Sequence, residues 1–432
     1  MTPLINAAAV AALADERVDW RFKGLPAAWN GRTPAQICAD PRELVSAGPL
    51  GPVCVLHADA LNHNLATMAD WCVRHGVELA PHGKTHMAPQ LLARQFEAGA
   101  CAVTAATISQ VRTLRAFGVR QVVLANELVD AAGLAWLAAE LDDDPDFRLI
   151  CWVDSTDGVR LMTQALDRAG RFSDARRPVE VCVELGAMGT RTGCRDDARA
   201  DEVAAAAVAS PRLRLVGVAG YEAALGHDVS AAGVQRVGDY LKWMRTVAAR
   251  LAQRCEVADI AEVVVTAGGS THFDLVARAL AGPWRTILRS GCYLTNDDGL
   301  YLRTSPLTRP GAEPGGFRAA MQVWAQVCSR PEPGLALVTM GRRDVSFDQG
   351  LPVPQQLWRD SHWTPDGLAG CEVTNLNDQH AFLRLSPAAE AVAVGDWIAF
   401  GVSHPCTVFD KWQLIPVLDR GGRVIELVRT FF

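Results

Sequence analysis

Short apolar, β-rich runs alternate with Ala/Leu-rich helical stretches from about residue 75 onward, and this alternation constrains the fold more than any other feature of the chain. Strands that alternate with helices predict a parallel sheet, and eight is the number of strands that closes a (β/α)8 barrel. A doubly wound open sheet is the alternative, because a strand count does not reveal closure. The eight runs are Val77–His82, Cys101–Ala106, Gln121–Asn126, Arg148–Val153, Val179–Leu185, Leu213–Gly220, Glu262–Gly268 and Arg285–Gly291.

Helical periodicity fades after about residue 295, and runs of apolar alternation take its place. These runs predict a second, mainly β domain. An earlier run, Pro52–Ala58, precedes the barrel pattern and is expected to pair with the late strands. We predict an N-terminal segment over residues 1–58 that partly joins the β domain, a barrel over residues 59–298 and a β-strand-rich domain over residues 299–432. The late runs are Ala319–Val327, Leu335–Thr339, Cys371–Asn375, Ala381–Leu385, Asp396–Gly401 and Val424–Thr430.

Composition excludes several classes of function. The 432 residues are 49% apolar and 21% charged, which is typical of a globular chain, and a net charge of −6 without basic clusters argues against nucleic-acid and membrane partners. A small-molecule partner is therefore expected. Twelve cysteines are too sparse for a disulfide framework, which indicates a reducing compartment. The apolar stretch Ala7–Ala14 is too short for a signal peptide or a membrane span, so we expect a cytoplasmic protein.

A lysine follows the first of the eight runs, in the sequence Pro81-His82-Gly83-Lys84-Thr85-His86. Barrel enzymes place catalytic groups at the carboxyl ends of their strands. Lysine forms a Schiff base with an aldehyde cofactor when burial or positive charge lowers its pKa, and His82 and His86 are placed to tune it. Taken alone, a loop lysine is usually a solvated side chain.

Two glycine-containing loops follow later runs. Gly268-Gly269-Ser270-Thr271 comes after the seventh run, where barrels often bind phosphate, and Arg289-Ser290-Gly291-Cys292-Tyr293 comes after the eighth. Glycines let backbone N–H groups approach an anion, although an ordinary Gly-rich turn has the same composition. Arg191 lies in a glycine-containing stretch that lacks the G-x-G-x-x-G spacing, so a dinucleotide site is not supported. Arg191 could instead reach a phenolate or a carboxylate.

The late segment Ser403-His404-Pro405-Cys406 contains a candidate metal-binding pair. In an extended backbone the period of two puts His404 and Cys406 on one face, so that both can bind one ion. An imidazole and a thiolate suit Zn²⁺, and two protein ligands leave positions open for catalysis. A His-x-Cys sequence also arises by chance. His380 is a weaker candidate for the same neighbourhood.

Lys84, the late Gly-rich loops and the following β domain together resemble the fold-type III pyridoxal phosphate (PLP) enzymes, the alanine-racemase-like group. Within this group the chain is most similar to the D-serine dehydratase and D-threonine aldolase family, and especially to its zinc-dependent D-serine dehydratase-like members. The similarity covers nearly the whole chain, although Met87 stands where many relatives have a second lysine. Its segments are Leu61–Met68, Pro81–His86, Glu184–Gly193, Gly217–His227, Gly268–Thr271, Gly291–Asp297, Thr339–Pro352 and Val402–Cys406.

The resemblance implies roles for the candidate residues. Lys84 is implied as the PLP-binding lysine and catalytic base, and His404 and Cys406 as ligands of Zn²⁺ or another divalent metal. Aldolase-like members typically carry His-x-Asp at this position and dehydratase-like members His-x-Cys, so Cys406 favours a dehydratase. A homodimer is also implied. The further cofactor-binding residues are Arg191 near the phenolic oxygen, Tyr221 near the ring, and Gly269, Ser270, Thr271, Gly291, Cys292 and Tyr293 around the phosphate.

These roles predict a PLP- and metal-dependent dehydratase that converts a β-hydroxy D-amino acid, such as D-serine, D-threonine or 3-hydroxy-D-aspartate, into a 2-oxo acid and ammonia. A D-threonine aldolase is the alternative, and a metal-free racemase is a third possibility. A non-catalytic PLP-binding protein is disfavoured by the strand-rich segment that follows about residue 300, because such relatives are single barrels. A sugar- or phosphate-binding barrel without PLP remains open at the level of the fold.

Overall fold

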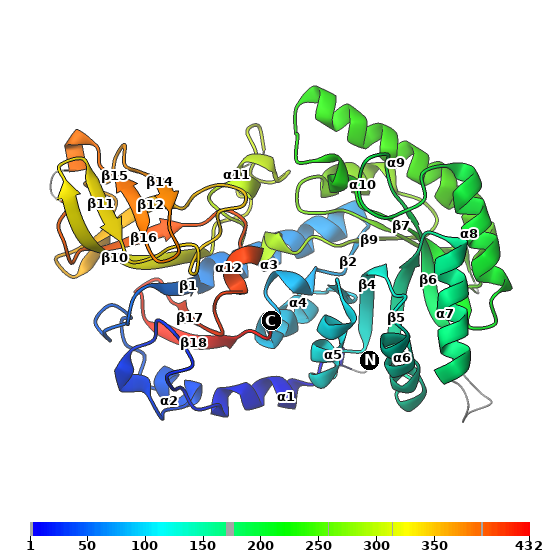
Figure 1. Ribbon diagram of the computed structural model, residues 1–432, viewed down its shortest axis with the longest axis horizontal. Helices are drawn as coiled ribbons and strands as arrows, with labels where there is room; N and C mark the ends of the chain where they lie inside the picture. The colour runs from blue at the N-terminus through cyan, green and yellow to red at the C-terminus, as the bar shows by residue number, and fades with distance from the viewer. Residues whose placement is uncertain (1–2, 170–176, 258, 313, 390–391) are drawn as a thin grey trace. The chain divides into compact units, whose positions relative to one another are not determined.

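The computed structural model describes residues 3–169, 177–257, 259–312, 314–389 and 392–432 (Figure 1). The chain divides into two compact units. Unit 1 comprises Met1–Asn6, Met68–Lys84 and Leu92–Gly291, and unit 2 comprises Ala7–Thr67, Thr85–Leu91 and Cys292–Phe432. Within the described ranges, no helix is both long enough and apolar enough to cross a bilayer.

Unit 1 contains an eight-stranded parallel sheet with the order β2-β9-β8-β7-β6-β5-β4-β3. Each of the eight expected runs holds one of these strands, so the predicted strand count is confirmed. Most runs are apolar along their whole length because a parallel sheet is covered on both faces. The strands are β2 (Glu78–Leu79), β3 (Val103–Ala105), β4 (Gln121–Glu127), β5 (Arg148–Val153), β6 (Val179–Leu185), β7 (Leu213–Gly220), β8 (Val264–Ala267) and β9 (Arg285–Leu288).

The sheet closes on itself between β2 and β3. The Cys101 N–H donates to the Leu79 carbonyl at 2.8 Å, and the Thr104 N–H donates to the Pro81 carbonyl at 2.9 Å. His82, just after β2, forms a parallel bridge with Thr104 in β3. Because β2 also pairs with β9, the eight strands form a ring. The barrel is therefore confirmed, and the open sheet is excluded.

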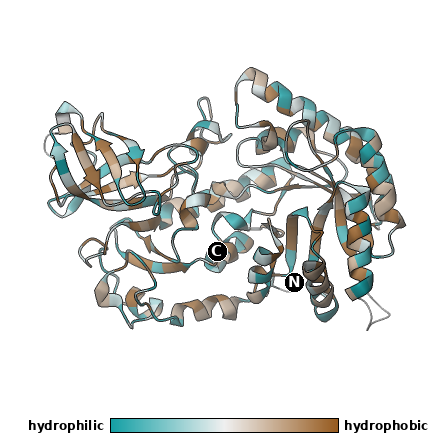
Figure 2. Ribbon diagram, in the orientation of Figure 1, coloured by the Kyte–Doolittle hydropathy of each residue, from teal (hydrophilic) through white to brown (hydrophobic). Residues whose placement is uncertain are grey.

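Helices flank the barrel strands in Figure 1, and Figure 2 shows brown strands beside helices that mix teal and brown. In α9 the apolar side chains of Val237, Leu241 and Met244 recur at intervals of three or four residues and are buried. Side chains cap several helices, such as Ser230 at the start of α9. The helices are α4 (Pro89–Glu97), α5 (Ile108–Ala116), α6 (Ala131–Asp143), α7 (Thr156–Ala169), α8 (Asp197–Ala209), α9 (Ala231–Leu251) and α10 (Phe273–Ala279).

Unit 2 is built on a sheet with the central order β13-β12-β16-β10-β1-β17-β18, with β11, β15 and β14 branching from β10. Strand β1, the first of these strands in the sequence, pairs antiparallel with β10 and parallel with β17. The second unit is mainly β, as expected. The strands are β1 (Val53–His57), β10 (Met321–Glu332), β11 (Leu335–Val338), β12 (Val353–Arg359), β13 (His362–Thr364), β14 (Glu372–Leu376), β15 (Ala381–Arg384), β16 (Trp397–Gly401), β17 (Leu414–Leu418) and β18 (Val424–Arg429). The remaining α-helices are α1 (Ala7–Ala11), α2 (Pro34–Cys38), α3 (Ala58–His75), α11 (Leu300–Thr304) and α12 (Cys406–Phe409).

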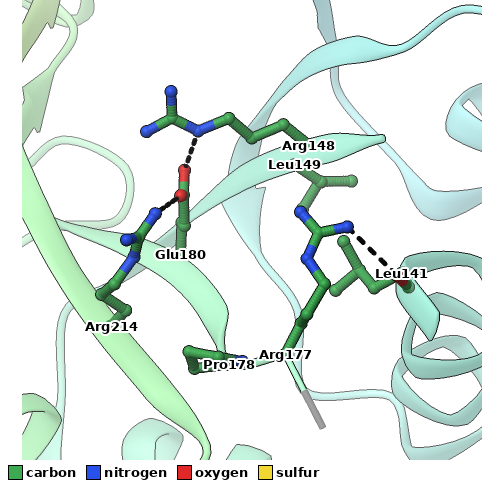
Figure 3. Close-up of a pocket in the computed structure, with 7 residues that line it drawn as sticks. All are labelled: Leu141, Arg148, Leu149, Arg177, Pro178, Glu180 and Arg214. Carbon is green, nitrogen blue, oxygen red and sulfur yellow. Dashed lines mark hydrogen bonds and ion pairs between the residues drawn. The ribbon is translucent and has the colours of Figure 1, made fainter. Parts of the chain in front are cut away.

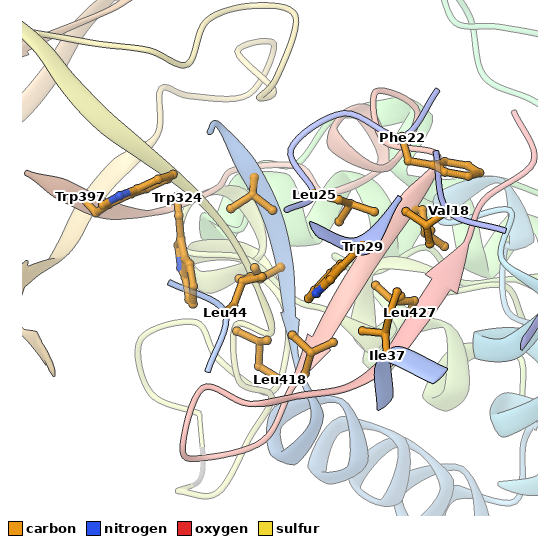
Figure 4. Packing of buried hydrophobic residues seen from close by; sticks show 14 of the residues in the cluster. Val18, Phe22, Leu25, Trp29, Ile37, Leu44, Trp324, Trp397, Leu418 and Leu427 are labelled. Carbon is orange, nitrogen blue, oxygen red and sulfur yellow. The ribbon is translucent and has the colours of Figure 1, made fainter. Parts of the chain in front are cut away.

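The N-terminal part of the chain completes the hydrophobic core of unit 2. Side chains from the segment before β1 pack against strand residues such as Trp324 and Leu427 (Figure 4). An ion pair of 2.9 Å between Glu16 and Arg429 in β18 adds to this packing. The segment therefore has a structural function. Its core residues are Val18, Phe22, Leu25, Trp29, Ile37 and Leu44.

Candidate functional site

Lys84 lies in the turn η3 (Gly83–Thr85), after β2, at the end of the barrel where every parallel strand ends. The chain has four lysines, and Lys84 is exposed. It forms no ion pair with any described residue, which leaves its amine available to a ligand. The other three are paired with carboxylates: Lys23 with Asp344, Lys242 with Asp239, and Lys411 with Asp410.

His82 lies two residues before Lys84, and its pKa reflects the positive charges at this end of the barrel. Burial, and then the positive charges of Lys84, Arg289 and Arg191, hold the pKa of His82 well below its usual range. The imidazole is therefore neutral. Its Nδ1 atom is buried and has no hydrogen-bond partner within the described ranges. A neutral, unpartnered nitrogen among three cations is a suitable neighbour for an anionic ligand.

The loop after β6 presents the Arg191 guanidinium. Arg195, four residues later, donates to the carbonyls of Thr192 at 2.9 Å and Gly193 at 2.8 Å, and so holds the loop closed. A Cβ atom on Gly186 would lie 2.2 Å from the backbone carbonyl oxygen of Thr192, so this position requires glycine. Arg191 is exposed, and its guanidinium lies over the Tyr221 ring at 5.3 Å from the centroid. The structure thus brings together Arg191 and Tyr221, which the family resemblance assigns to the same cofactor.

The Gly-rich loop after β8 is held by a buried carboxylate that the sequence analysis missed. Glu222 accepts hydrogen bonds from the N–H groups of Gly268 at 2.9 Å and Gly269 at 2.7 Å. Gly269 therefore has no free N–H for a phosphate, and its contribution is close packing, because a Cβ atom there would lie 3.0 Å from the Tyr221 ring. The backbone N–H groups of Ser270 and Thr271 donate to no other described residue.

The loop after β9 is tied to the loop after β8. The Arg289 N–H and the Ser290 hydroxyl both donate to the Gly268 carbonyl at 3.1 Å. Gly291 follows and is buried. This end of unit 1 therefore offers a lysine without an ionic partner, a buried orphan imidazole nitrogen and N–H groups beside a hydroxyl. Those features fit the aldehyde, the polar ring substituents and the phosphate of PLP.

Cys292 and Tyr293 belong to unit 2, where they begin the turn η7 (Cys292–Leu294). Both are buried. The Tyr293 ring lies 6.0 Å from the Phe317 ring, centroid to centroid. The Cys292 sulfur lies 3.2 Å from the Cys406 sulfur. A residue expected near the phosphate and a residue expected to bind the metal are therefore in contact through their thiols.

His404 and Cys406 lie in a turn, so the expectation of an extended segment was wrong. His404 has a φ of 65°, and Pro405 is helical, because the chain turns here into α12. Asp297 stabilises this left-handed conformation, because its carboxylate accepts the His404 N–H at 2.9 Å. Asp297 also accepts the Gly299 N–H at 2.9 Å. It thus caps the following turn and positions the candidate metal loop.

Asp348 orients the His404 ring. Its carboxylate accepts from His404 Nδ1 at 2.5 Å and from the Thr407 hydroxyl at 2.9 Å. Burial opposes a charged imidazole, but the contacts with Cys406 and Asp348 outweigh it and raise the pKa of His404 to about 9. The Cys292 thiol and His404 hold the pKa of Cys406 well below its usual range. Near neutral pH the pair is therefore an imidazolium beside a thiolate, and a metal that binds here would displace the proton of the ring.

This donor set fits Zn²⁺, which favours nitrogen and sulfur ligands, and a carboxylate behind the ring is the usual partner of a metal-binding histidine. Among the described residues, no group of three or more His, Cys, Asp or Glu side chains is arranged to hold an ion. A metal bound here would have His404 and Cys406 as its protein ligands. His380 is exposed, between β14 and β15.

Two glutamates that the sequence analysis did not single out lie at or near the ends of β4 and β6, the two strands on either side of β5. Glu127 is the last residue of β4, and Glu184 lies near the end of β6 and is 2% exposed. Both Glu127 carboxylate oxygens and Glu184 Oε2 are buried and have no other hydrogen-bond partner among the described residues. Burial, and then the nearby charge of Glu184, raise the pKa of Glu127 to about 9. The pair therefore holds a proton near neutral pH.

We expect the Glu127→Gln variant to lose the pH dependence of stability that this proton causes. The folded protein keeps the proton up to about pH 9, whereas the unfolded chain releases it near pH 4.5. The stabilisation is therefore fully present below pH 4.5 and is lost as the pH rises toward 9. Relative to the variant, the wild-type free energy of unfolding should fall by up to about 6 kcal/mol across this range, because each pH unit between the two pKa values corresponds to about 1.4 kcal/mol.

Denaturant unfolding at a series of pH values measures this difference, and the exposed Glu97→Gln substitution is the control for the loss of one carboxylate. Parallel pH profiles of the wild type and Glu127→Gln would show that Glu127 ionises normally in the folded protein.

A cavity of about 200 Å³ lies among residues at the starts of β5, β6 and β7, which is the opposite end of these strands from the loops described above (Figure 3). Its carboxylate, Glu180, forms ion pairs with Arg148 at 2.6 Å and with Arg214. Arg177 is bound to backbone carbonyls, including that of Phe147 at 2.8 Å. The charges of these arginines are thus used in contacts within the protein. Residues at this end of a barrel usually contribute to stability rather than to catalysis.

Comparisons with known proteins match both parts of the chain. A sequence family described as "Alanine racemase, N-terminal domain" covers residues 56–295, and another described as "Putative serine dehydratase domain" covers residues 320–418. D-threonine aldolase of Arthrobacter sp. is 27% identical over 374 residues, which are 86% of this chain and 89% of that protein. D-threo-3-hydroxyaspartate dehydratase of Delftia sp. is 27% identical over 398 residues, which are 86% of this chain and 95% of that protein.

The fold has the same relatives. The crystal structure of D-threonine aldolase from Filomicrobium marinum has a TM-score of 0.72 and 26% sequence identity, and the match covers 88% of this chain and 94% of that one. These homologues are PLP-dependent lyases, and PLP is the cofactor that the fold-type III family supports. The chain therefore belongs to the alanine racemase N-terminal domain family, the fold-type III PLP enzymes, and joins that barrel to a D-serine dehydratase-like domain.

Proposed function

We propose that this protein is a PLP- and zinc-dependent dehydratase that converts β-hydroxy D-amino acids into 2-oxo acids and ammonia. The observation that carries the proposal is the pair formed by His404 and Cys406, with Asp348 bound to Nδ1 of the imidazole. The D-threo-3-hydroxyaspartate dehydratase of Delftia, which matches most of this chain, supports the same chemistry.

The residues of unit 1 suit the first half of such a reaction. PLP, when bound, acts as an electron sink that stabilises negative charge at the α-carbon of an amino acid. Lys84 would hold the cofactor covalently, and its amine would be the base that takes the α-proton. Arg191 would bind the phenolic oxygen, and the N–H groups of Ser270 and Thr271 would bind the phosphate.

The residues of unit 2 suit the second half, in which the β-hydroxyl departs. A Zn²⁺ ion, when bound, supplies a Lewis acid that makes hydroxide a better leaving group. His404 and Cys406 would hold the ion through nitrogen and sulfur. Asp348 would keep the His404 ring oriented, and Asp297 would fix the backbone of the same residue.

A D-threonine aldolase is the second candidate, because the Arthrobacter aldolase matches 86% of this chain at 27% identity. The two reactions differ in what they ask of the β-hydroxyl. Dehydration removes it as hydroxide, whereas aldol cleavage deprotonates it so that the Cα–Cβ bond breaks. The same metal position could serve either demand, so the products must decide between them.

D-Threonine distinguishes the two candidates in one assay of the protein loaded with PLP and Zn²⁺. We expect 2-oxobutyrate and ammonia, no reaction with L-threonine, and loss of the reaction on chelation. Glycine and acetaldehyde would instead establish an aldolase. L-allo-Threonine, the product of inversion at the α-carbon alone, would establish a metal-free racemase if it still formed after chelation. The absence of turnover with D-serine, D-threonine and 3-hydroxy-D-aspartate would contradict all three.

A further inference from the structure

Two thiols from distant parts of the sequence touch in unit 2. The sulfur atoms of Cys292 and Cys406 are 3.2 Å apart, although the residues are separated by 114 positions in the chain. Cys292 is 5% exposed, and Cys406 is partly exposed. All twelve cysteines are free thiols. The function proposed above uses Cys406 alone, so the Cys292 thiol has no assigned purpose.

The surroundings hold the two thiols in register. Asp297, five residues after Cys292, accepts the backbone N–H of His404, two residues before Cys406. The Ser403 hydroxyl accepts the N–H of Leu300 at 3.2 Å, and the Asp298 N–H donates to the Val402 carbonyl at 2.9 Å. Both segments are therefore fixed to each other by several hydrogen bonds. A disulfide bond is about 2.05 Å long, so the sulfur atoms need to approach by only about 1.2 Å.

We propose that Cys292 and Cys406 form a redox modification site, at which a hydroperoxide joins the two thiols in a disulfide and so removes Cys406 from the metal. The thiol pair itself stands on the contact described above, and only the consequence for the metal rests on the proposed function. Bound metal and the disulfide exclude each other, because each needs the Cys406 sulfur.

The chemistry balances with the peroxide as oxidant. One thiolate attacks the O–O bond, which breaks, and it becomes a sulfenic acid while the other oxygen leaves as an alcohol, or as water when the oxidant is hydrogen peroxide. The second thiol displaces the sulfenic oxygen, which leaves as water, and the S–S bond forms. Two sulfur atoms are oxidised, and the peroxide oxygens are reduced. A thiol reductant reverses the modification.

Trypsin separates the two cysteines cleanly, because Cys292 is the only cysteine in residues 290–303 and Cys406 the only one in residues 385–411. Metal-free protein is treated with hydrogen peroxide, alkylated, digested without reductant and analysed by mass spectrometry. Exposed Cys328 is first replaced by serine, which removes the cysteine most open to intermolecular disulfides. We expect a species with the mass of both peptides less two hydrogen atoms, which a thiol reductant abolishes.

The Cys292→Ser variant is expected to lack the linked species. If that variant does not fold, the peptide map of protein that keeps both cysteines still tests the proposal. Recovery of both peptides in alkylated form after oxidation would overturn the proposal. So would a Cys406 sulfinic acid beside an unmodified Cys292, because it would show that the second thiol does not capture the first oxidation product.

Zinc content measured on the same samples separates this proposal from the function proposed above. We expect reduced protein to bind Zn²⁺ and oxidised protein to retain only background levels, and Zn²⁺ added before the peroxide should prevent the linkage. Equal zinc content in both forms would refute the exclusion between disulfide and metal. If reduced protein binds no Zn²⁺ and yet forms the disulfide, the metal-dependent function fails while the redox pair stands.

Discussion

Replacement of Lys84 by alanine is expected to abolish covalent binding of PLP and to lower the turnover of any D-amino acid substrate by at least about 10³-fold, because in the proposed function one amine both anchors the cofactor and moves the α-proton. Borohydride reduction followed by tryptic mapping locates the cofactor. Trypsin does not cleave after a modified lysine, so PLP on Lys84 appears in the undivided peptide of residues 75–94.

The small number of lysines makes this experiment selective. Lys242, which is 74% exposed and pairs with Asp239, is the matched control. Its replacement by alanine should leave both the absorbance of the bound cofactor and the turnover unchanged. Reduced PLP on Lys23, Lys242 or Lys411, or a Lys84→Ala protein that keeps the absorbance of lysine-bound PLP, would show that the cofactor is held elsewhere.

The barrel could be predicted from the sequence because its strands are short, apolar and bounded by polar or glycine-containing turns. Its closure could not, since it depends on hydrogen bonds from Cys101 and Thr104 to residues on the other side of a helix. Strands β12, β13 and β17 were also missed. Strands β12 and β17 each contain a proline, Pro354 and Pro416, and prolines are rare in strand interiors. Strand β13 has only three residues.

The candidate site was predictable where residue type and chemistry coincide and unpredictable where support comes from afar. Lys84, Arg191 and the His404/Cys406 pair stand out because few side chains perform their chemistry. Asp348 orients His404 from 56 residues away, and nothing in the local sequence distinguishes it from other acidic residues. Glu222 likewise holds the loop after β8 from 46 and 47 residues away.

The conformation of the His404 segment shows a second limit. Period-two spacing suggested an extended backbone, but a hydrogen bond from the His404 N–H to Asp297 stabilises a left-handed residue before α12. The two side chains meet through that turn rather than through a strand. A spacing of two is therefore compatible with more than one backbone geometry, and the choice is made by a carboxylate that is distant in the sequence.

Replacement of Cys406 by alanine is expected to remove bound Zn²⁺ and to slow loss of the β-hydroxyl by about 10²-fold or more, since a Lewis acid at a leaving oxygen contributes several kcal/mol. Covalent binding of PLP to Lys84 should persist, because the lysine does not depend on the metal ligands. Zinc content, cofactor absorbance and ammonia release from D-threonine measure the three properties on one sample.

A graded series separates ligands from the residue that positions them. His404→Ala should match Cys406→Ala, whereas Asp348→Asn, which weakens the orientation of the His404 ring but removes no ligand, should lower zinc affinity by only about 10-fold. Cys371→Ala is the control, because this partly exposed cysteine lies in the same unit. Full zinc content in Cys406→Ala would mean that the thiolate is not a ligand, and the preference for dehydration over aldol cleavage would then lose its structural support.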